Sequence, residues 1–146
     1  MKRFPVIGVL CVSVVFGLSA CSDDSDNSPS DEASKATQAA AALCTDLAAL
    51  KADNAKLKAL SPANATKDQV KDAYDAVQKD WEGVKENTSA LKEAERSAVQ
   101  SAAEDLKKAY EALPGDTTGQ DALTQLQPKI QTLDQATTSA SSGLKC

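Results

Sequence analysis

Apolar side chains recur at steps of three and four residues along most of the chain, the spacing that places them on one face of an α-helix. Such stripes occupy residues 36–57, 70–113 and 123–144. Ser61-Pro62 and Leu113-Pro114-Gly115 separate them, because proline disfavours helix at the preceding residue and cannot donate a backbone hydrogen bond. No segment alternates with the period of two that indicates a half-buried strand. The pattern therefore predicts an all-α protein.

The stripes define the candidate core. Its members are Ala36, Ala40, Leu43, Leu47, Leu50, Asn54 and Leu57, then Val70, Tyr74, Val77, Trp81, Val84, Thr88, Leu91, Glu95, Ala98, Ala102, Leu106, Ala109 and Leu113, then Leu123, Leu126, Ile130, Leu133, Thr137, Ala140 and Leu144. Asn54 either fixes the helix register, as buried asparagines do in coiled coils, or lies at the rim of the core. Pro128 lies off the last stripe, so we expect a kink that leaves the apolar face aligned.

The middle stripe leaves the number of helices open. Thr66-Lys67-Asp68-Gln69 has the pattern of a capping box that begins a helix. The unbroken phase up to Leu113 favours one helix of roughly 47 residues, about 70 Å long. Asn87-Thr88-Ser89 favours a break, because these residues are good N-caps and poor helix formers. We expect an antiparallel three- to four-helix bundle over residues 36–146.

The first twenty residues have the three parts of an export signal: basic Lys2 and Arg3, an apolar run over residues 4–18, and small residues before Cys21. The run is shorter than the roughly 20 residues of a membrane span, and acidic residues follow it. Leu18-Ser19-Ala20-Cys21 resembles the lipobox of bacterial lipoproteins. This resemblance implies cleavage between Ala20 and Cys21 and a lipid on the Cys21 thiol, whereas an ordinary secretory signal is the alternative.

After this signal peptide, residues 1–20, we expect a lipidated cysteine and a disordered acidic tether over residues 21–35. The first part of the tether, residues 22–31, contains no apolar side chain that could offset the entropy of ordering.

We then expect three different outcomes for the four cysteines. Cys11 is lost with the signal, Cys21 is acylated, and Cys44 and Cys146 remain. An isolated pair outside the cytoplasm predicts a disulfide, and two free thiols are the alternative. The last helix returns to the level of Cys44 in a bundle of three helices as well as in one of four. The expected pairing of Cys44 with Cys146 therefore does not decide the number of helices.

The chemistry of the chain argues against catalysis. It has no histidine, which removes the commonest general base and a frequent metal ligand, so we expect no enzyme, cofactor or metal site. Removal of residues 1–20 takes away two positive charges and no negative one, and the net charge changes from −5 to −7. This acidic balance excludes nucleic acid as the expected partner.

Over the mature chain, a cysteine near the start of the first helix, helices rich in Ala, Leu, Asp and Lys, and a C-terminal cysteine resemble the small helical lipoproteins of actinobacteria whose activity is unassigned. The resemblance implies no activity. We expect a non-enzymatic module on the outer face of the cell membrane, held by its lipid anchor and facing an envelope-protein or cell-wall partner. A carrier with a small-ligand cavity between Ala-rich helices is the alternative.

Overall fold

The computed structural model describes residues 29–146. They form the α-helices α1 (Pro29–Ala59), α2 (Lys67–Asn87), α3 (Glu93–Glu111) and α4 (Gly119–Leu144), with a 3-10 turn, η1 (Thr88–Ala90), between α2 and α3. This part of the chain contains no strand, and the prediction of an all-α protein is confirmed. The predicted signal peptide, its cleavage between Ala20 and Cys21, and the acylation of Cys21 lie outside the described residues.

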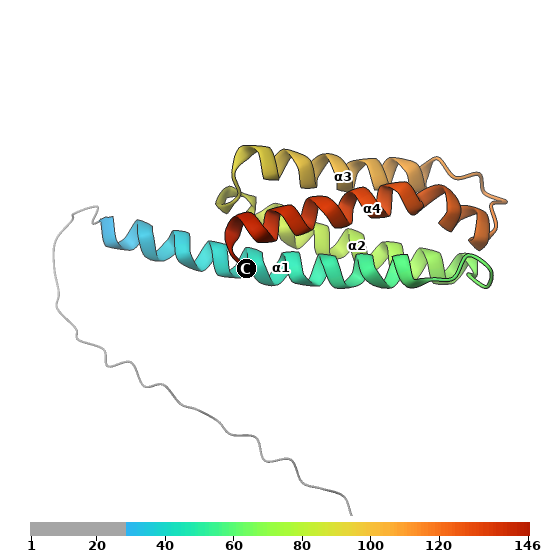
Figure 1. The fold of residues 1–146 in the computed structure, drawn as a ribbon, viewed down its shortest axis with the longest axis horizontal. Coiled ribbons are helices and arrows are strands. Elements are labelled where there is room, and N and C mark those ends of the chain that lie inside the picture. Colours follow the sequence, from blue (N-terminus) through green and yellow to red (C-terminus); the bar gives the residue numbers. More distant parts are fainter. Residues whose placement is uncertain (1–28) are drawn as a thin grey trace, which may run out of the picture.

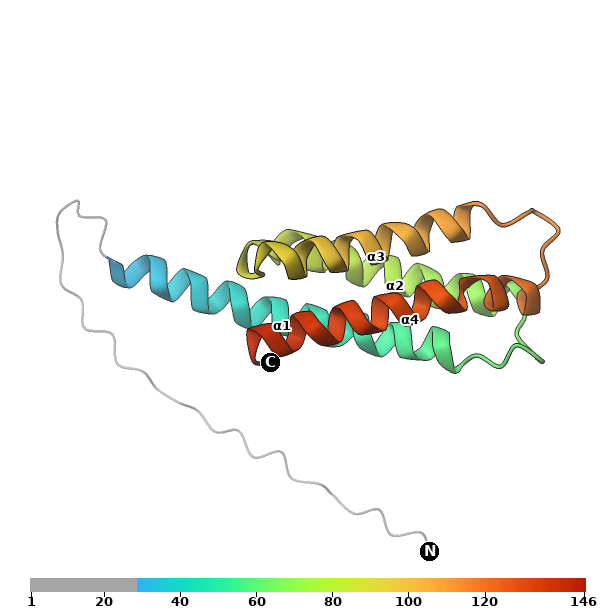
Figure 2. The same ribbon diagram turned by 45° about the horizontal axis from the view of Figure 1, so that its top comes forward.

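Successive helices run in opposite directions (Figure 1). α1 contacts both α2 and α4, and α3 packs mainly on α4, while α2 and α3 touch at few points. Both views place the α1–α2 and α3–α4 connections, residues 60–66 and 112–118, at one end of the molecule, which we call the loop end (Figure 2). None of the helices within residues 29–146 has the length and apolarity of a membrane span.

The core follows the predicted stripes most closely in α2 and α4. All five members from Val70 to Val84 are buried, and so are the six from Leu123 to Ala140. α1 contributes residues that are fully buried: Leu43, Leu47, Leu50, Asn54 and Leu57. Several predicted members are only half-buried, namely Ala40, Thr88, Glu95, Ala109, Leu113 and Leu144. One continuous core joins the four helices.

Thr137 is the polar member of the core in α4. Its side chain is fully buried. Its hydroxyl donates to the Leu133 carbonyl of the preceding turn at 2.8 Å, so the helix itself satisfies this buried polar group.

The break that Asn87-Thr88-Ser89 favours is present, and the alternative of one long helix is wrong. α2 ends at Asn87, and α3 begins at Glu93. Arg96 holds the turn, because its Nε donates to the Thr88 carbonyl and its Nη2 donates to the Leu91 carbonyl, both at 3.1 Å. Within α3, Ala102 and Leu106 are buried as predicted, whereas Ala98, a predicted core residue, is exposed and Val99 is buried in its place.

α1 begins earlier than predicted. Residues 29–35, expected to belong to the disordered tether, are helical, and Ala36, expected in the core, is exposed. Proline is favourable at a first helical position, as at Pro29, and the alanines that follow have high helix propensity. Residues 33–38 are all exposed, and this part of α1 projects beyond the other three helices (Figure 1).

Asn54 lies in the core and not at its rim. Its side chain is fully buried, and its Nδ2 donates to the Ile130 carbonyl of α4 at 3.0 Å. Its Oδ1 is buried without a hydrogen-bond partner. The contact joins residues that are 76 positions apart, so it favours one register of α1 against α4. Pro128 lies inside α4, which continues through it to Leu144.

Candidate functional site

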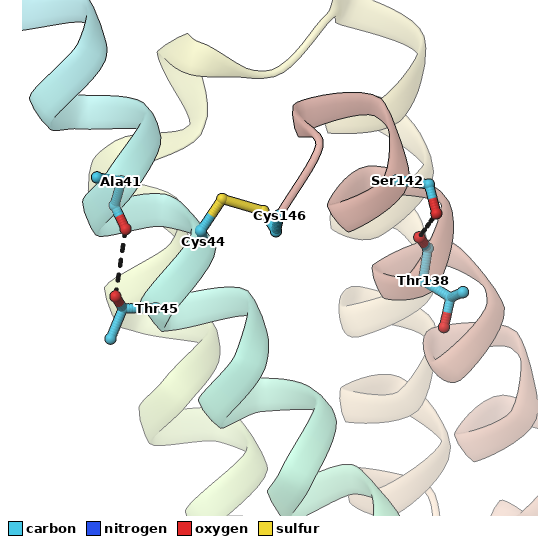
Figure 3. Close-up of a disulfide and its surroundings, with 6 residues drawn as sticks. All are labelled: Ala41, Cys44, Thr45, Thr138, Ser142 and Cys146. Carbon is cyan, nitrogen blue, oxygen red and sulfur yellow. Dashed lines mark hydrogen bonds between the residues drawn. A yellow bond between two sulfur atoms is a disulfide. The ribbon is translucent and has the colours of Figure 1, made fainter.

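Two features could carry function: a disulfide beside the end of α4 and a pocket at the loop end. The disulfide joins Cys44 of α1 to Cys146, with their Cα atoms 5.5 Å apart (Figure 3). The chain reverses after α4 because Lys145 adopts a left-handed conformation, with φ of 60°, and the Cys146 amide donates to the Ser141 carbonyl. This turn brings Cys146 against α1, so that the pair expected from the cysteine count is joined.

The pocket has a volume of about 280 Å³ and opens between α2, the end of α3 and the start of α4. Its apolar lining comes from Val70, Leu113, Pro114 and Ala122, with the ring of Tyr110 beside them. Its charged lining residues are Lys67 and Glu111. These residues come from three helices and one connection, so the pocket exists only because the loop end brings them together.

The α1–α2 connection is held against the start of α4. Gln120 Nε2 donates to the Ala63 carbonyl at 2.7 Å. Gly119 is buried, and a Cβ atom at this position would lie 2.2 Å from the carbonyl oxygen of Ala65. Two non-bonded atoms do not approach so closely, so only glycine fits here without a backbone shift.

The capping box at Thr66 is confirmed, and it fixes the first turn of α2. The Thr66 hydroxyl accepts from the Gln69 amide, and the Gln69 side chain accepts from the Thr66 amide. The cap places Lys67 at the first helical position, where its Nζ donates to the Gly115 carbonyl at 2.5 Å. One lysine therefore connects α2 to the α3–α4 connection across the pocket.

Tyr110, which lines the pocket, belongs to an aromatic pair between α2 and α3. The rings of Tyr74 and Tyr110 stack with centroids 3.8 Å apart and an angle of 8° between their planes. Burial raises the pKa of Tyr74 to about 12, and the Glu111 carboxylate adds to that rise. Burial also raises the pKa of Tyr110. Both phenols are thus neutral near pH 7 and form a stacked aromatic pair instead of an acid–base pair.

The charges of the pocket are unequally matched. The Glu111 carboxylate lies 3.8 Å from the Lys107 ammonium, one turn earlier on α3. Lys67 belongs to none of the ion pairs formed within residues 29–146, and the hydrogen bond from its ammonium goes to an uncharged carbonyl. The positive charge at the pocket is therefore the one without a close counter-charge.

A pair of carboxylates lies elsewhere, between α1 and α2. Burial raises the pKa of Asp80, and the neighbouring Asp53 carboxylate raises it further. The Lys56 ammonium donates to Asp53 at 2.5 Å, while Asp80 Oδ2 is buried without a hydrogen-bond partner. These residues do not line the pocket. Among the described residues, no group of three or more acidic, histidine or cysteine side chains could hold a metal ion.

The sequence indicated the cysteine pair but not the pocket. The signals that could have located the pocket are the helix stop at Leu113-Pro114-Gly115 and the capping box at Thr66, because an antiparallel arrangement brings both to the same end of the bundle.

Comparison with known proteins supplies no relative: no protein-family model, curated protein or solved structure matches the chain.

Proposed function

We propose that the protein is an extracytoplasmic lipoprotein, anchored to the cell membrane through an acylated Cys21, with an antiparallel helical bundle that acts as a non-enzymatic interaction module of the envelope. The observation that carries this proposal is Leu18-Ser19-Ala20-Cys21 directly after an apolar run of signal length. Each CH₂ of a buried acyl chain contributes about 0.8 kcal/mol, so two or three chains would hold the protein on the membrane.

The geometry of α1 supports a defined orientation for such a module. Seven residues separate Cys21 from Pro29, and a chain of that length spans at most about 25 Å. From Pro29, the 31 residues of α1 run about 46 Å to the loop end. If α1 points away from the membrane in the anchored protein, the loop end is the part that reaches furthest from the lipid and the surface that a partner meets first.

The disulfide supports a role outside the cytoplasm. It joins cysteines 102 positions apart, and closing a loop of this length stabilises the fold by about 4 to 5 kcal/mol on the chain-entropy model. Such bonds persist in oxidising compartments and are rare in the cytosol. The net charge of the chain is negative, which favours a protein or cell-wall partner over nucleic acid.

The intact mass of protein extracted from membranes of the native organism, before and after reduction, tests the anchor. We expect a chain that begins at Cys21 and carries acyl groups, and a gain of two hydrogen atoms on reduction. A chain that begins at Met1, or an unmodified thiol at Cys21, would refute the proposal.

A pull-down from envelope extracts tests the partner. The mature chain is the bait, and its lipidated residues 21–35 alone are the control. We expect the helical part to retain a component that the control does not, and equal recovery from both baits would contradict an interaction module.

A carrier of small ligands is the second candidate, because the pocket at the loop end offers an apolar lining with two charged groups at its edge. Native mass spectrometry of the protein purified from its own cells should then show a co-purifying small molecule. A uniform apo mass would contradict the carrier and leave the anchored module unaffected.

A further inference from the structure

The pocket at the loop end contains one ammonium group that lacks a close counter-charge, beside a lining that is mostly apolar. From this we infer that the pocket binds a small carboxylic acid whose body is aromatic or otherwise apolar, with the carboxylate at Lys67. The inference rests on the carrier function proposed above and names the chemical class of its ligand.

The charge of the ligand follows from the pairing of the two charged lining residues. Glu111 already has the Lys107 ammonium as its partner, so a cationic ligand would have to compete with an existing ion pair. The Lys67 ammonium has three N–H donors and uses one for the Gly115 carbonyl. Two donors remain, and an ionised oxygen acceptor such as a carboxylate accepts them more strongly than an uncharged group does.

The size of the ligand follows from the pocket volume. The 280 Å³ of the pocket is close to the lower limit of known ligand sites, which span roughly 300–1,000 Å³. At about 30 Å³ per water molecule the pocket has room for about nine waters. Benzoate has nine non-hydrogen atoms, and because bonded atoms each occupy less volume than a free water molecule, benzoate fits within this space.

The aromatic preference follows from Tyr110. Tyr110 lines the pocket, and its ring stacks on the Tyr74 ring with centroids 3.8 Å apart. A ring that is held in place by stacking can contact a second ring in the pocket, and aromatic pairs of this kind contribute more than their buried area alone. Val70, Leu113 and Ala122 supply the remaining apolar contacts.

The chain contains two tyrosines, Tyr74 and Tyr110, which gives a direct readout. The full lipidated protein, labelled with ¹³C in its tyrosine rings and held in lipid nanodiscs, should show two sets of ring signals. Titration with benzoate at pH 7 should move the Tyr110 signals, with saturation below about 20 mM, as expected for so small a ligand. Benzamide has nearly the same shape and no charge, and it should bind roughly 10-fold more weakly.

Three variants separate the pocket from general charge effects. Lys67→Gln should reduce benzoate affinity to the benzamide level, and Lys67→Arg should retain most of it. Lys79→Gln removes an exposed lysine of the same helix outside the pocket and should change nothing.

The inference is refuted if the Tyr110 signals do not move, if benzamide binds as tightly as benzoate, or if Lys79→Gln weakens binding as much as Lys67→Gln. A co-purifying molecule from cells, found together with such a negative titration, would keep the carrier function and remove only this ligand class.

Discussion

Two glycines should respond in opposite directions to the same substitution. Gly83 lies inside α2, where an added Cβ atom would lie 3.7 Å from Asp46 Cγ, an ordinary contact distance. Gly119 begins α4, where the added atom would lie 2.2 Å from the Ala65 carbonyl oxygen and 2.5 Å from the Thr66 carbonyl carbon. The neighbours at Gly119 are backbone atoms, which cannot rotate away as a side chain can.

The magnitudes follow from these contacts. Gly83→Ala should raise the free energy of unfolding by about 0.5 to 1 kcal/mol, because alanine loses less conformational entropy than glycine in a helix. Gly119→Ala forces residues 65 and 66 away from α4 and disturbs the capping box at Thr66, and we expect a loss of about 1 to 3 kcal/mol, typical of overpacking. The two variants should therefore differ by roughly 1.5 to 4 kcal/mol.

Urea unfolding followed by far-UV circular dichroism, with the disulfide intact, measures the difference. For a slope of about 1 to 3 kcal/mol per molar urea, the midpoints should be separated by roughly 0.5 M or more, with the wild type between them. Matching spectra without urea would show that each variant is folded at the start. If Gly119→Ala is as stable as the wild type, the close approach of α4 to the α1–α2 connection is wrong.

Three further predictions concern the disulfide, the buried amide and the buried phenol. Reduction of Cys44–Cys146 should lower the free energy of unfolding by about 4 to 5 kcal/mol, seen as a large drop in the urea midpoint, and an unchanged midpoint would contradict the ring closure. Asn54→Asp places a carboxylate beside the Ile130 carbonyl and should cost about 3 kcal/mol or more at pH 7, whereas Asn54→Leu should cost far less. Burial should raise the pKa of the new carboxyl in Asn54→Asp, and the carboxyl becomes neutral as the pH falls through that pKa. The loss of stability measured by urea unfolding should therefore be smaller in acid. A loss of stability that is independent of pH would count against the buried site. The pKa of Tyr74 is raised to about 12, so its contribution to stability is complete below about pH 10 and is lost as the pH rises toward 12. Over this range the free energy of unfolding should depend less on pH in Tyr74→Phe than in the wild type. An equal dependence on pH in both proteins would refute the raised pKa.

The apolar pattern predicted most of the core because burial and helical period coincide in α2 and α4. It predicted fewer helix boundaries and core residues correctly where two local signals disagreed. Between Asn87 and Leu91 the stripe keeps its phase while the capping residues favour a break, and the decisive contact is made by Arg96, eight residues after Thr88. Val99 is buried in place of Ala98, and with Ala102 and Leu106 it keeps the helical spacing of three and four residues, so the sequence carried a signal for it.

The start of α1 and the pocket escaped prediction for different reasons. Residues 29–35 carry few apolar side chains, so a criterion based on burial assigns them to the tether, although Pro29 is favourable at the start of a helix. The pocket depends on how Lys67, Tyr110 and Ala122 meet in space; the helix stop and the capping box indicate the end of the bundle where they lie, but the spacing along the chain does not give the shape that they form. The cysteine pair was predictable because counting needs no geometry.

The unequal packing of α3 affects how readily this helix separates from the bundle. α3 contacts mainly α4, whereas α1 and α4 each pack on two helices or more and are linked to each other through the disulfide. Detachment of α3 breaks one main helix interface and leaves that covalent link closed, so we expect faster amide hydrogen exchange in α3 than in the packed parts of α1 and α4. Because Tyr110 belongs to α3, such a detachment would also separate the stacked rings of Tyr74 and Tyr110.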